Sequence, residues 1–348
     1  MNGDAPSGRG PVSKTRPPST RTTKRDKKRI HWAPLNIGLE RRLQTLIVLC
    51  HTLTIVLFLC SFFFTCAIPP ILAPPPPLPS LHLPILNSTN IRRPQMPKEE
   101  ELPPTKKYIF GYHPHGIISH GAFAAFGTEA LGFKKLFPGI TNTLLTLDSN
   151  FRIPFYRDYA LAMGIASVSR ESCENLLSKG GANGEGMGRA ITIVIGGARE
   201  SLNAQPHSLR LVLKRRKGFV KLAIRTGADL VPVLAFGEND LYQQVDSDEH
   251  PIIQKVQMLV KSTMGFTIPL FHARGVFNYD VGLMPYRRPL NIVVGRPIPV
   301  MQQSNRDMID DSYIDELHAK YVEELQRLWD TWKDVYAKDR NGELEIIS

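Results

Sequence analysis

Two histidines that follow a short apolar stretch are the residues best suited to chemistry in this 348-residue chain. Residues 108–116 read Tyr-Ile-Phe-Gly-Tyr-His-Pro-His-Gly, and the aromatic and branched residues at the start predict a short buried strand. Pro114 favours an extended residue before it, so His113 and His115 are expected on one face, at a loop after the strand. Imidazole is the side chain whose ordinary pKa lies nearest to neutral pH, which suits a general base.

Two other roles compete with that of a base. Polar residues at a strand end often bond only to the backbone, and the nonapeptide alone does not choose between this role and catalysis. Metal binding is the other role, because His113, His115 and His120 lie within eight positions. No carboxylate falls between His113 and Glu129, however, and no nearby cysteine completes a zinc set. We therefore expect no metal.

A second polar cluster follows the β-branched run at 191–195. Gly196 and Gly197 allow backbone N–H groups to approach a ligand closely, as at anion sites and oxyanion holes. Arg199 and Glu200 add a cation and an acceptor at the carboxyl end of a strand, where open α/β sheets bind ligands. A tight turn with a local ion pair would explain the same residues.

A basic run, Lys214-Arg215-Arg216-Lys217, opens a predicted helix. Such a run is commonly a solvated face, but it also suits the phosphates of a nucleotide-tailed carrier such as coenzyme A. The Gly-rich stretch 180–188 precedes its strand and contains no Gly-Lys-Ser/Thr, so it fits no phosphate-loop pattern and predicts a flexible surface loop.

Charge is unevenly placed along the chain. Residues 1–30 hold nine Lys/Arg against two Asp, which leaves +4 of the net +11 for the remainder. The body lacks zinc-finger, basic-zipper and RNA-reading signatures, so no nucleic-acid partner is expected. The four cysteines form no Cys-x-x-Cys pair or even framework, which excludes a disulfide-stapled secreted protein.

The uncharged run from 43 to 68 is long enough to cross a bilayer, which needs about 20 apolar residues. Arg41 and Arg42 at its start place the N-terminus in the cytosol. Residues 68–86 are also uncharged but contain eight prolines, so they suit a broken return leg of a hairpin, a re-entrant piece or a polyproline spacer. We predict a disordered basic cytosolic tail (1–40), a transmembrane helix (41–68), a Pro-rich membrane-associated segment and linker (69–104) and a globular domain (105–348).

Strands and helices alternate through the globular domain. Dense β-branched runs occur at 191–195, 230–236 and 291–294, and helical patterns occur at 218–225 and around 159–161. This alternation predicts an α/β fold, a mostly parallel sheet flanked by helices. Apolar residues at steps of three and four over 310–337 predict an amphipathic helix that packs on the domain.

Several further motifs follow the nonapeptide at 108–116 in order along about 102–337. They are Asn150-Phe with Ile-Pro-Phe-Tyr-Arg-Asp-Tyr (153–159), Ser-Val-Ser-Arg-Glu-Ser-Cys (167–173), Gly-Gly-Ala-Arg-Glu-Ser-Leu (196–202), Arg-Lys-Gly-Phe-Val-Lys-Leu-Ala (216–223), Gly-Ala-Asp-Leu-Val-Pro-Val (227–233), Phe-Gly-Glu-Asn-Asp (236–240) and Val-Gly-Arg-Pro-Ile (294–298). This ordered set resembles the diacylglycerol acyltransferase type 2 family, which is related to the glycerolipid acyltransferases. The related glycerolipid enzymes place an aspartate four residues after their histidine. Ser119 occupies that position here, so the pattern is that of the type 2 family.

The resemblance implies a glycerolipid-acyltransferase-like fold and transfer of a fatty acyl group from acyl-CoA to diacylglycerol, with no cofactor. It also implies residence in the endoplasmic reticulum membrane, with the catalytic domain facing the cytosol, and on lipid droplets; a homo-oligomer is compatible with it. We expect His115 to be the base, His113 to orient it or share its role, and Glu200 to hold the imidazole tautomer or the glycerol hydroxyl. Expected substrate-binding residues are Gly116, Gly196, Gly197, Arg199, Arg157, Lys214, Arg215, Arg216 and Lys217.

Three other functions share these features. A sister enzyme would acylate monoacylglycerol, a long-chain alcohol or a lysophospholipid. A non-catalytic lipid-droplet protein or a metal-dependent enzyme using the three histidines would be of a different class.

Overall fold

The structure is a computed structural model, and it describes the globular body and a few positions before it. The described residues are 101–153, 156–244, 270–275, 277–303 and 309–348, the backbone of 90–95, and single positions or short runs within 32–53 and at 255 and 259. The predicted tail (1–40), transmembrane helix (41–68) and Pro-rich segment (69–104) fall mostly outside them. Among the described residues, no helix is both long and apolar enough to cross a bilayer.

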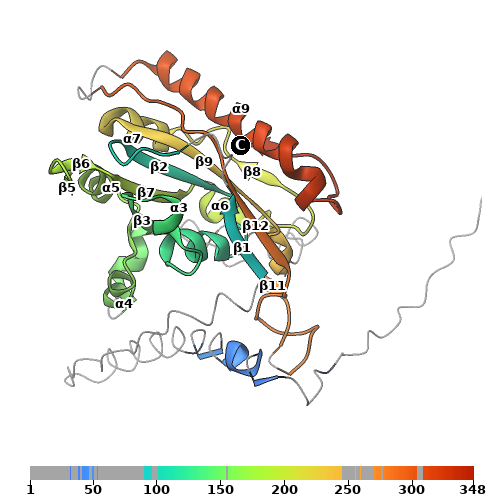
Figure 1. The fold of residues 1–348 in the computed structure, drawn as a ribbon. Coiled ribbons are helices and arrows are strands. Elements are labelled where there is room, and N and C mark those ends of the chain that lie inside the picture. Colours follow the sequence, from blue (N-terminus) through green and yellow to red (C-terminus); the bar gives the residue numbers. More distant parts are fainter. Residues whose placement is uncertain are drawn as a thin grey trace, which may run out of the picture.

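A seven-stranded sheet forms the centre of the described body (Figure 1). Its order is β1 (Asn90–Gln95), β12 (Pro289–Val294), β9 (Ala228–Phe236), β2 (Lys107–His113), β7 (Arg189–Val194), β3 (Thr141–Thr146) and β4 (Ala166–Ser167). Every neighbouring pair is parallel except β12 with β9, which is antiparallel. The predicted mostly parallel sheet is confirmed, and β2 lies at its middle between β9 and β7.

Both faces of the sheet are covered. One apolar cluster joins the sheet to α5 (Arg170–Ser178), α7 (Gly218–Thr226) and α9 (Asp311–Tyr336). The other contains residues from α2 (His120–Ala122), the π-helical turn η2 (Phe123–Gly127) and α3 (Phe133–Leu136). In Figure 1 the long red helix α9 crosses one side of the sheet.

The alternation of β2 shows how the sequence specifies two cores. Tyr108, Phe110 and Tyr112 belong to the cluster with α2 and α3, whereas Ile109 belongs to the cluster with α9. Successive side chains of a strand point to opposite faces, so a strand with no polar face must be covered on both sides. His113, the last residue of β2, falls on the side of Ile109 and α9.

Shorter elements complete the domain. They are η3 (Asp148–Arg152), α4 (Tyr156–Ala162), α6 (Gly197–Ser201), η4 (Asn239–Leu241), and the strand pairs β5 (Gly180–Gly181) with β6 (Glu185–Met187), β8 (Arg210–Val212) with β13 (Glu345–Ile347), and β10 (Gln243–Gln244) with β11 (Phe271–His272). The stretch 180–188, predicted as a flexible loop, instead contains the β5–β6 ladder, because Oδ1 of Asn183 accepts the N–H groups of Glu185 and Met187.

The predicted C-terminal amphipathic helix is confirmed as α9. Asp310 accepts the N–H of Ser312 at 2.9 Å and so caps its start. Its buried residues recur at helical spacing and pack on the sheet and on α7: Ile314, Leu317, Tyr321, Leu325, Leu328 and Trp329.

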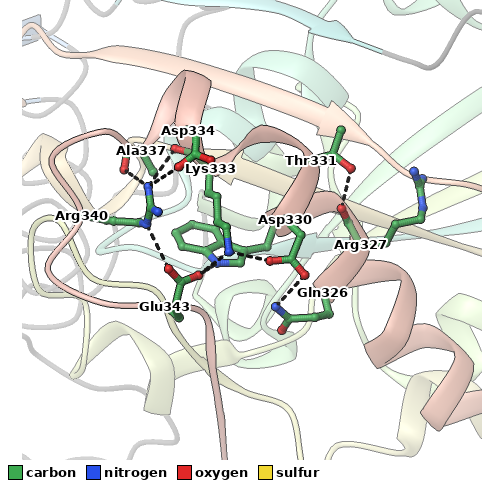
Figure 2. A network of polar contacts seen from close by, with 10 residues as sticks. Gln326, Arg327, Asp330, Thr331, Lys333, Asp334, Ala337, Arg340 and Glu343 are labelled. Carbon is green, nitrogen blue, oxygen red and sulfur yellow. Dashed lines mark hydrogen bonds and ion pairs between the residues drawn. The ribbon is translucent and has the colours of Figure 1, made fainter.

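The chain after α9 is bonded back to that helix by a polar network (Figure 2). Lys333 Nζ lies 2.8 Å from Glu343, and the indole N–H of Trp329 donates to the same carboxylate at 2.6 Å. Nε of Arg340 lies 3.3 Å from Oε1 of Glu343. Lys333 and these other donors hold the pKa of Glu343 at about 2.

This network directs the last strand to the basic run. β13 pairs with β8, and the carbonyl of Ile347 accepts the N–H of Leu213 at 3.1 Å and of Lys214 at 3.0 Å. The C-terminus therefore fixes the backbone where the basic run begins.

Candidate active site

The first histidine, His113, is fully buried at the carboxyl end of β2. Its Nε2 lies 3.1 Å from the hydroxyl of Tyr321, and that hydroxyl donates to the carbonyl of Gly111 at 3.0 Å. Since the hydroxyl has one proton, His113 must be the donor to it, which places the His113 proton on Nε2. Burial lowers the pKa of His113 to about 3, so this imidazole is neutral.

The second histidine, His115, lies in the loop after β2 and is half-buried. Its Nδ1 is 3.1 Å from the carbonyl of Gly116. A carbonyl only accepts, so the proton is on Nδ1 and the lone pair is on Nε2. Burial lowers the pKa of His115, although the Gly116 carbonyl opposes the shift. A neutral imidazole with a free Nε2 lone pair is the form that a general base requires.

The carbonyl of Gly116 therefore sets the tautomer of His115. Ser119 occupies the position at which the related glycerolipid enzymes are expected to have an aspartate, and it donates its hydroxyl to the carbonyl of His115 at 2.8 Å. Because β2 ends at His113, the strand alternation that predicted both histidines on one face does not extend to His115.

Glu200 joins the two clusters predicted from the sequence. It lies in α6, directly after β7, and is buried. Oε1 accepts the N–H of His115 and Oε2 accepts the N–H of Val212, each at 2.6 Å. Its observed partners are therefore backbone donors, whereas we expected it to hold the imidazole or a substrate hydroxyl.

Burial raises the pKa of Glu200 to about 7, although the two backbone donors and the Arg216 charge oppose this shift. The neighbouring Gly196 has no room for a side chain, because an added Cβ would lie 2.2 Å from the Glu200 carboxyl. A glycine at 196 is thus required for this carboxylate to reach the histidine loop. Gly197 adopts a φ of +61°, which favours glycine.

A second buried carboxylate, Glu238, holds the other end of the histidine loop. It follows β9, and it accepts the N–H of His120 at 2.7 Å, the N–H of Gly121 at 3.0 Å and the hydroxyl of Tyr112 at 2.7 Å. Burial raises the pKa of Glu238 to about 7, against the effect of these donors. A Cβ on Gly116 would lie 2.7 Å from Cγ of Glu238, so this carboxylate also contacts the loop directly.

Glu238 and Tyr321 were not among the predicted site residues, although each gives a signal in the sequence. Glu238 follows Gly237 at the end of the strand run 230–236, as Glu200 follows its own strand and glycines. The rule that ligands gather at carboxyl strand ends would have selected both. Tyr321 belongs to the apolar stripe of the last helix, where a hydroxyl is hard to distinguish from a packing residue.

The basic residues divide by position. Arg216 lies beside the site, because its Nη2 is 3.4 Å from the carbonyl of Gly196. Lys217 pairs with Asp315 of α9. Lys214 and Arg215 are exposed next to them, as is Arg199 on α6. A cationic surface therefore borders the turn that Glu200 occupies.

Arg157 lies apart from this group. It is exposed on α4, which lies in Figure 1 well away from α6 and the end of β2. Its predicted role in substrate binding therefore has no support from its position.

The third histidine, His120, lies at the start of α2, and its Nε2 is 3.3 Å from the hydroxyl of Tyr242. In the part of the chain that the structure describes, no three His, Cys, Asp or Glu side chains converge as metal ligands.

Comparison with known proteins identifies the family of the chain. The sequence profile of the family "Diacylglycerol acyltransferase" matches residues 94–347. Diacylglycerol O-acyltransferase 2A of Umbelopsis ramanniana is 49% identical over 339 residues, 91% of this chain and 93% of its own length. Diacylglycerol O-acyltransferase 1 of Schizosaccharomyces pombe is 50% identical over 72% of this chain and 70% of its own. 2-acylglycerol O-acyltransferase 1 of Bos taurus is 47% identical over 71% of each.

Among solved structures, the 1-acyl-sn-glycerophosphate acyltransferase PlsC of Thermotoga maritima aligns over 68% of this chain and 72% of that chain. The identity is 13% and the TM-score 0.34, a likeness too weak to carry an argument. The match of the family profile to most of the described body, and the identities near one half, decide the family. This chain is a member of the diacylglycerol acyltransferase family.

Proposed function

We propose that this chain transfers a fatty acyl group from acyl-CoA to the free hydroxyl of 1,2-diacylglycerol, giving triacylglycerol and CoA. The observation that carries the proposal is the neutral imidazole of His115, whose Nδ1 is engaged by the Gly116 carbonyl, so that the lone pair is on Nε2. The assignment of diacylglycerol as the acceptor is supported by relatives that are named diacylglycerol O-acyltransferase and are 42–50% identical to this chain.

Nε2 of His115 takes the proton of the acceptor hydroxyl as its oxygen attacks the thioester carbonyl. The tetrahedral intermediate then collapses, the C–S bond breaks, and the imidazolium returns the proton to the CoA sulfur. Such a base contributes roughly 10²–10⁴-fold in rate. Of the two histidines, His115 is the better base, because His113 is fully buried and burial lowers its pKa to about 3.

The oxyanion of the intermediate needs hydrogen-bond donors close to His115. We assign this role to the backbone N–H groups at Gly196 and Gly197, because Glu200 links their turn to the His115 backbone. The phosphates of CoA then meet Arg216, with Lys214, Arg215 and Arg199 around them. Guanidinium groups bind phosphate through paired hydrogen bonds, which suits Arg216 at the inner edge.

An assay distinguishes the acceptor from that of the sister reaction, since two 2-acylglycerol O-acyltransferases are also 47% identical to this chain. The full chain, purified in detergent, should be assayed with oleoyl-CoA against 1,2-diacylglycerol, 2-monoacylglycerol, a long-chain alcohol and a lysophospholipid. We expect the highest kcat/KM with diacylglycerol, and a rate lower by roughly 10²–10⁴-fold for His115→Ala with every acceptor.

A preference for 2-monoacylglycerol would assign the chain to the sister reaction. If the parent protein forms no more product than His115→Ala with any of the four acceptors, the proposal is overturned in favour of a non-catalytic lipid-droplet protein.

We propose that the protein resides in the endoplasmic reticulum membrane, with its catalytic domain facing the cytosol, and on the surface of lipid droplets. The support for a membrane location is the uncharged run 43–68, preceded by Arg41 and Arg42, which place the N-terminus in the cytosol. The cytosolic orientation of the catalytic domain requires the uncharged, Pro-rich run 68–86 to be the return leg of a hairpin, since a single crossing would place that domain in the lumen. Membrane lipids are then a partner of the chain, and both of its substrates are available there. Protease protection of a C-terminal epitope in sealed microsomes would contradict the cytosolic orientation.

A further inference from the structure

A loop between β11 and β12 exposes large apolar side chains. Phe277, Val281 and Leu283 expose 74%, 57% and 64% of their surface, and Tyr279 exposes 39%. Isolated exposed apolar residues are ordinary, but four within seven positions form a patch that normally marks a contact surface.

Hydrogen bonds hold the backbone beneath these side chains. Arg274 and Met284 exchange two bonds of 3.0 Å, and the N–H of Ala273 donates to the carbonyl of Gly282 at 2.7 Å. Oδ1 of Asn278 also accepts the N–H of Val281 at 2.7 Å. The exposed apolar side chains therefore project from a turn whose backbone is held by hydrogen bonds.

The loop is joined to the N-terminal part of the chain. Trp32, which exposes 70% of its surface, forms an antiparallel bridge with Asn278. Nη2 of Arg287 lies 3.5 Å from the hydroxyl of Thr45. Figure 1 shows the orange loop next to the blue N-terminal positions.

Those N-terminal positions present a second apolar surface. Leu39, Leu43 and Leu46 are exposed, and their spacing of four and three places them on one face of a helix. Leu43 also begins the uncharged run 43–68, the longest apolar run of the chain. The exposed loop and the start of the expected membrane segment are thus neighbours.

Charge and residue type indicate what covers this surface. Arg41, Arg42 and Arg288 are exposed at its edges, and Trp32 and Tyr279 are of the type that concentrates where a bilayer meets water. An apolar tip rimmed by aromatic and basic residues matches a phospholipid layer with anionic headgroups better than it matches a protein partner.

The same surface reaches the histidine loop. Ile117, two residues after His115, is buried in a cluster with Tyr242 and Ala273 at the base of the apolar loop. The next residue, Ile118, exposes 59% of its surface. A layer that covers the apolar loop would therefore lie close to the proposed base.

We propose that the segment 277–283, Trp32 and the leucine face at 39–46 form one docking surface for a phospholipid layer, which holds the His115 loop against that layer. The docking rests on the exposed side chains alone. Its benefit for diacylglycerol delivery rests on the proposed function, because that acceptor is dissolved in the layer.

Depth-dependent fluorescence quenching tests the docking without an activity assay. The full-length Phe277→Trp variant is reconstituted in phosphatidylcholine–phosphatidylserine vesicles with a brominated phosphatidylcholine as quencher. The matched control is Val335→Trp, because Val335 is an apolar residue of α9 that exposes 54% of its surface and is not part of the proposed surface. The unsubstituted protein gives the background of its three native tryptophans.

We expect the added tryptophan at 277 to be quenched about twofold or more over the one at 335. Equal quenching at the two positions would overturn the proposal. Protection of position 277 that grows with protein concentration in lipid-free detergent would also overturn it, in favour of a second copy of the chain.

Kinetics in two substrate forms test the consequence. The Phe277→Ser/Leu283→Ser variant should lose about tenfold in rate on long-chain diacylglycerol in vesicles, while its rate on a short-chain diacylglycerol in detergent stays unchanged. Val335→Ser should change neither rate. Equal losses in both forms, or none in either, would contradict the proposal. An inactive unsubstituted protein would count against the proposed function, and the quenching result would still decide the docking.

Discussion

The backbone N–H of His115 donates to Oε1 of Glu200 at 2.6 Å, although 85 positions separate the two residues in the chain. The bond joins the loop after β2 to the turn after β7, and the Glu238 bonds fix the same loop from β9. The loop therefore owes its position to backbone hydrogen bonds, which are accepted by two buried carboxylates. The geometry of His115 depends on these carboxylates more than on any contact of its own side chain.

The absence of a side chain at position 196 is directly testable. In Gly196→Ala the new Cβ would meet the Glu200 carboxyl at 2.2 Å, so the carboxylate must move away from the His115 N–H. We expect kcat to fall by about 10²-fold, since displacement of a positioned group by about 1 Å costs that much. The φ of Gly196 is −59°, which alanine adopts freely, so the effect is steric. Gly218→Ala, where a Cβ meets nothing within 4 Å, should retain wild-type kcat.

The two buried carboxylates predict a pH dependence of stability. Glu238 has its pKa raised from 4.5 to about 7 in the folded protein. Between these values the unfolded chain binds fewer protons than the folded one, so this residue's contribution to folding stability falls as pH rises through the interval. Glu238→Gln removes the titration. The free energy of unfolding of the variant, relative to the parent, should therefore rise from about pH 4.5 to about pH 7 and then level off.

Denaturant titrations of both proteins in detergent at several pH values measure that difference. A relative free energy of unfolding that stays constant across this range, or one that falls, would show that the pKa of the Glu238 carboxyl is not raised in the folded protein. Glu200, with the same shift, would be intact in both proteins and so cancels from the comparison.

The hydroxyl of Tyr321 satisfies both the imidazole of His113 and the carbonyl of Gly111. Tyr321→Phe leaves two buried polar groups without this partner, so we expect a loss of stability of about 1–3 kcal/mol. Thermal unfolding in detergent checks it. Tyr313→Phe, in the first turn of the same helix, removes one hydroxyl that bonds a single N–H at Met301 in a more exposed place and should cost less. An equal cost at both positions would argue against the buried His113 contact.

The C-terminal network should influence acyl-CoA binding through the basic run. In Glu343→Gln the contacts with Lys333 and Arg340 weaken, and the strand that bonds Leu213 and Lys214 is less firmly held. We expect the KM for acyl-CoA to rise about twofold to fivefold with little change in kcat, since exposed ion pairs contribute modestly. Glu316→Gln, which breaks an exposed pair with Lys320 on the same helix, is the control and should leave KM unchanged.

Most of the architecture could be predicted because the signals are local. The apolar run of β2 and the β-branched runs of β7 and β9 are dense enough to identify buried strands, and the 3.6-residue stripe identifies α9. The meeting of the two polar clusters follows from a general rule, since carboxyl ends of parallel strands share one edge of a sheet. Whether a strand runs parallel or antiparallel is a long-range property, which explains why the reversed pairing of β12 was not foreseen.

The chemical roles within the site were harder to predict. The partner of each carboxylate is a backbone N–H, and a backbone group carries no sequence signature. The tautomer of His115 is set by a carbonyl for the same reason. The role of Arg157 stays a prediction, because this motif residue lies exposed on α4, apart from the other residues expected at the site.

The central claim, that Nε2 of His115 is the base, is tested most directly by kcat for acyl transfer with the His115→Ala protein at saturating oleoyl-CoA and diacylglycerol. His113→Ala serves as the comparison in the same vesicles, and thermal unfolding confirms that each variant is folded. The account predicts a fall of roughly 10²–10⁴-fold for His115→Ala, with stability close to that of the parent, and a stability defect as the main effect at His113. A His115→Ala protein whose kcat stays near the parent's, while His113→Ala is folded and inactive, would contradict it.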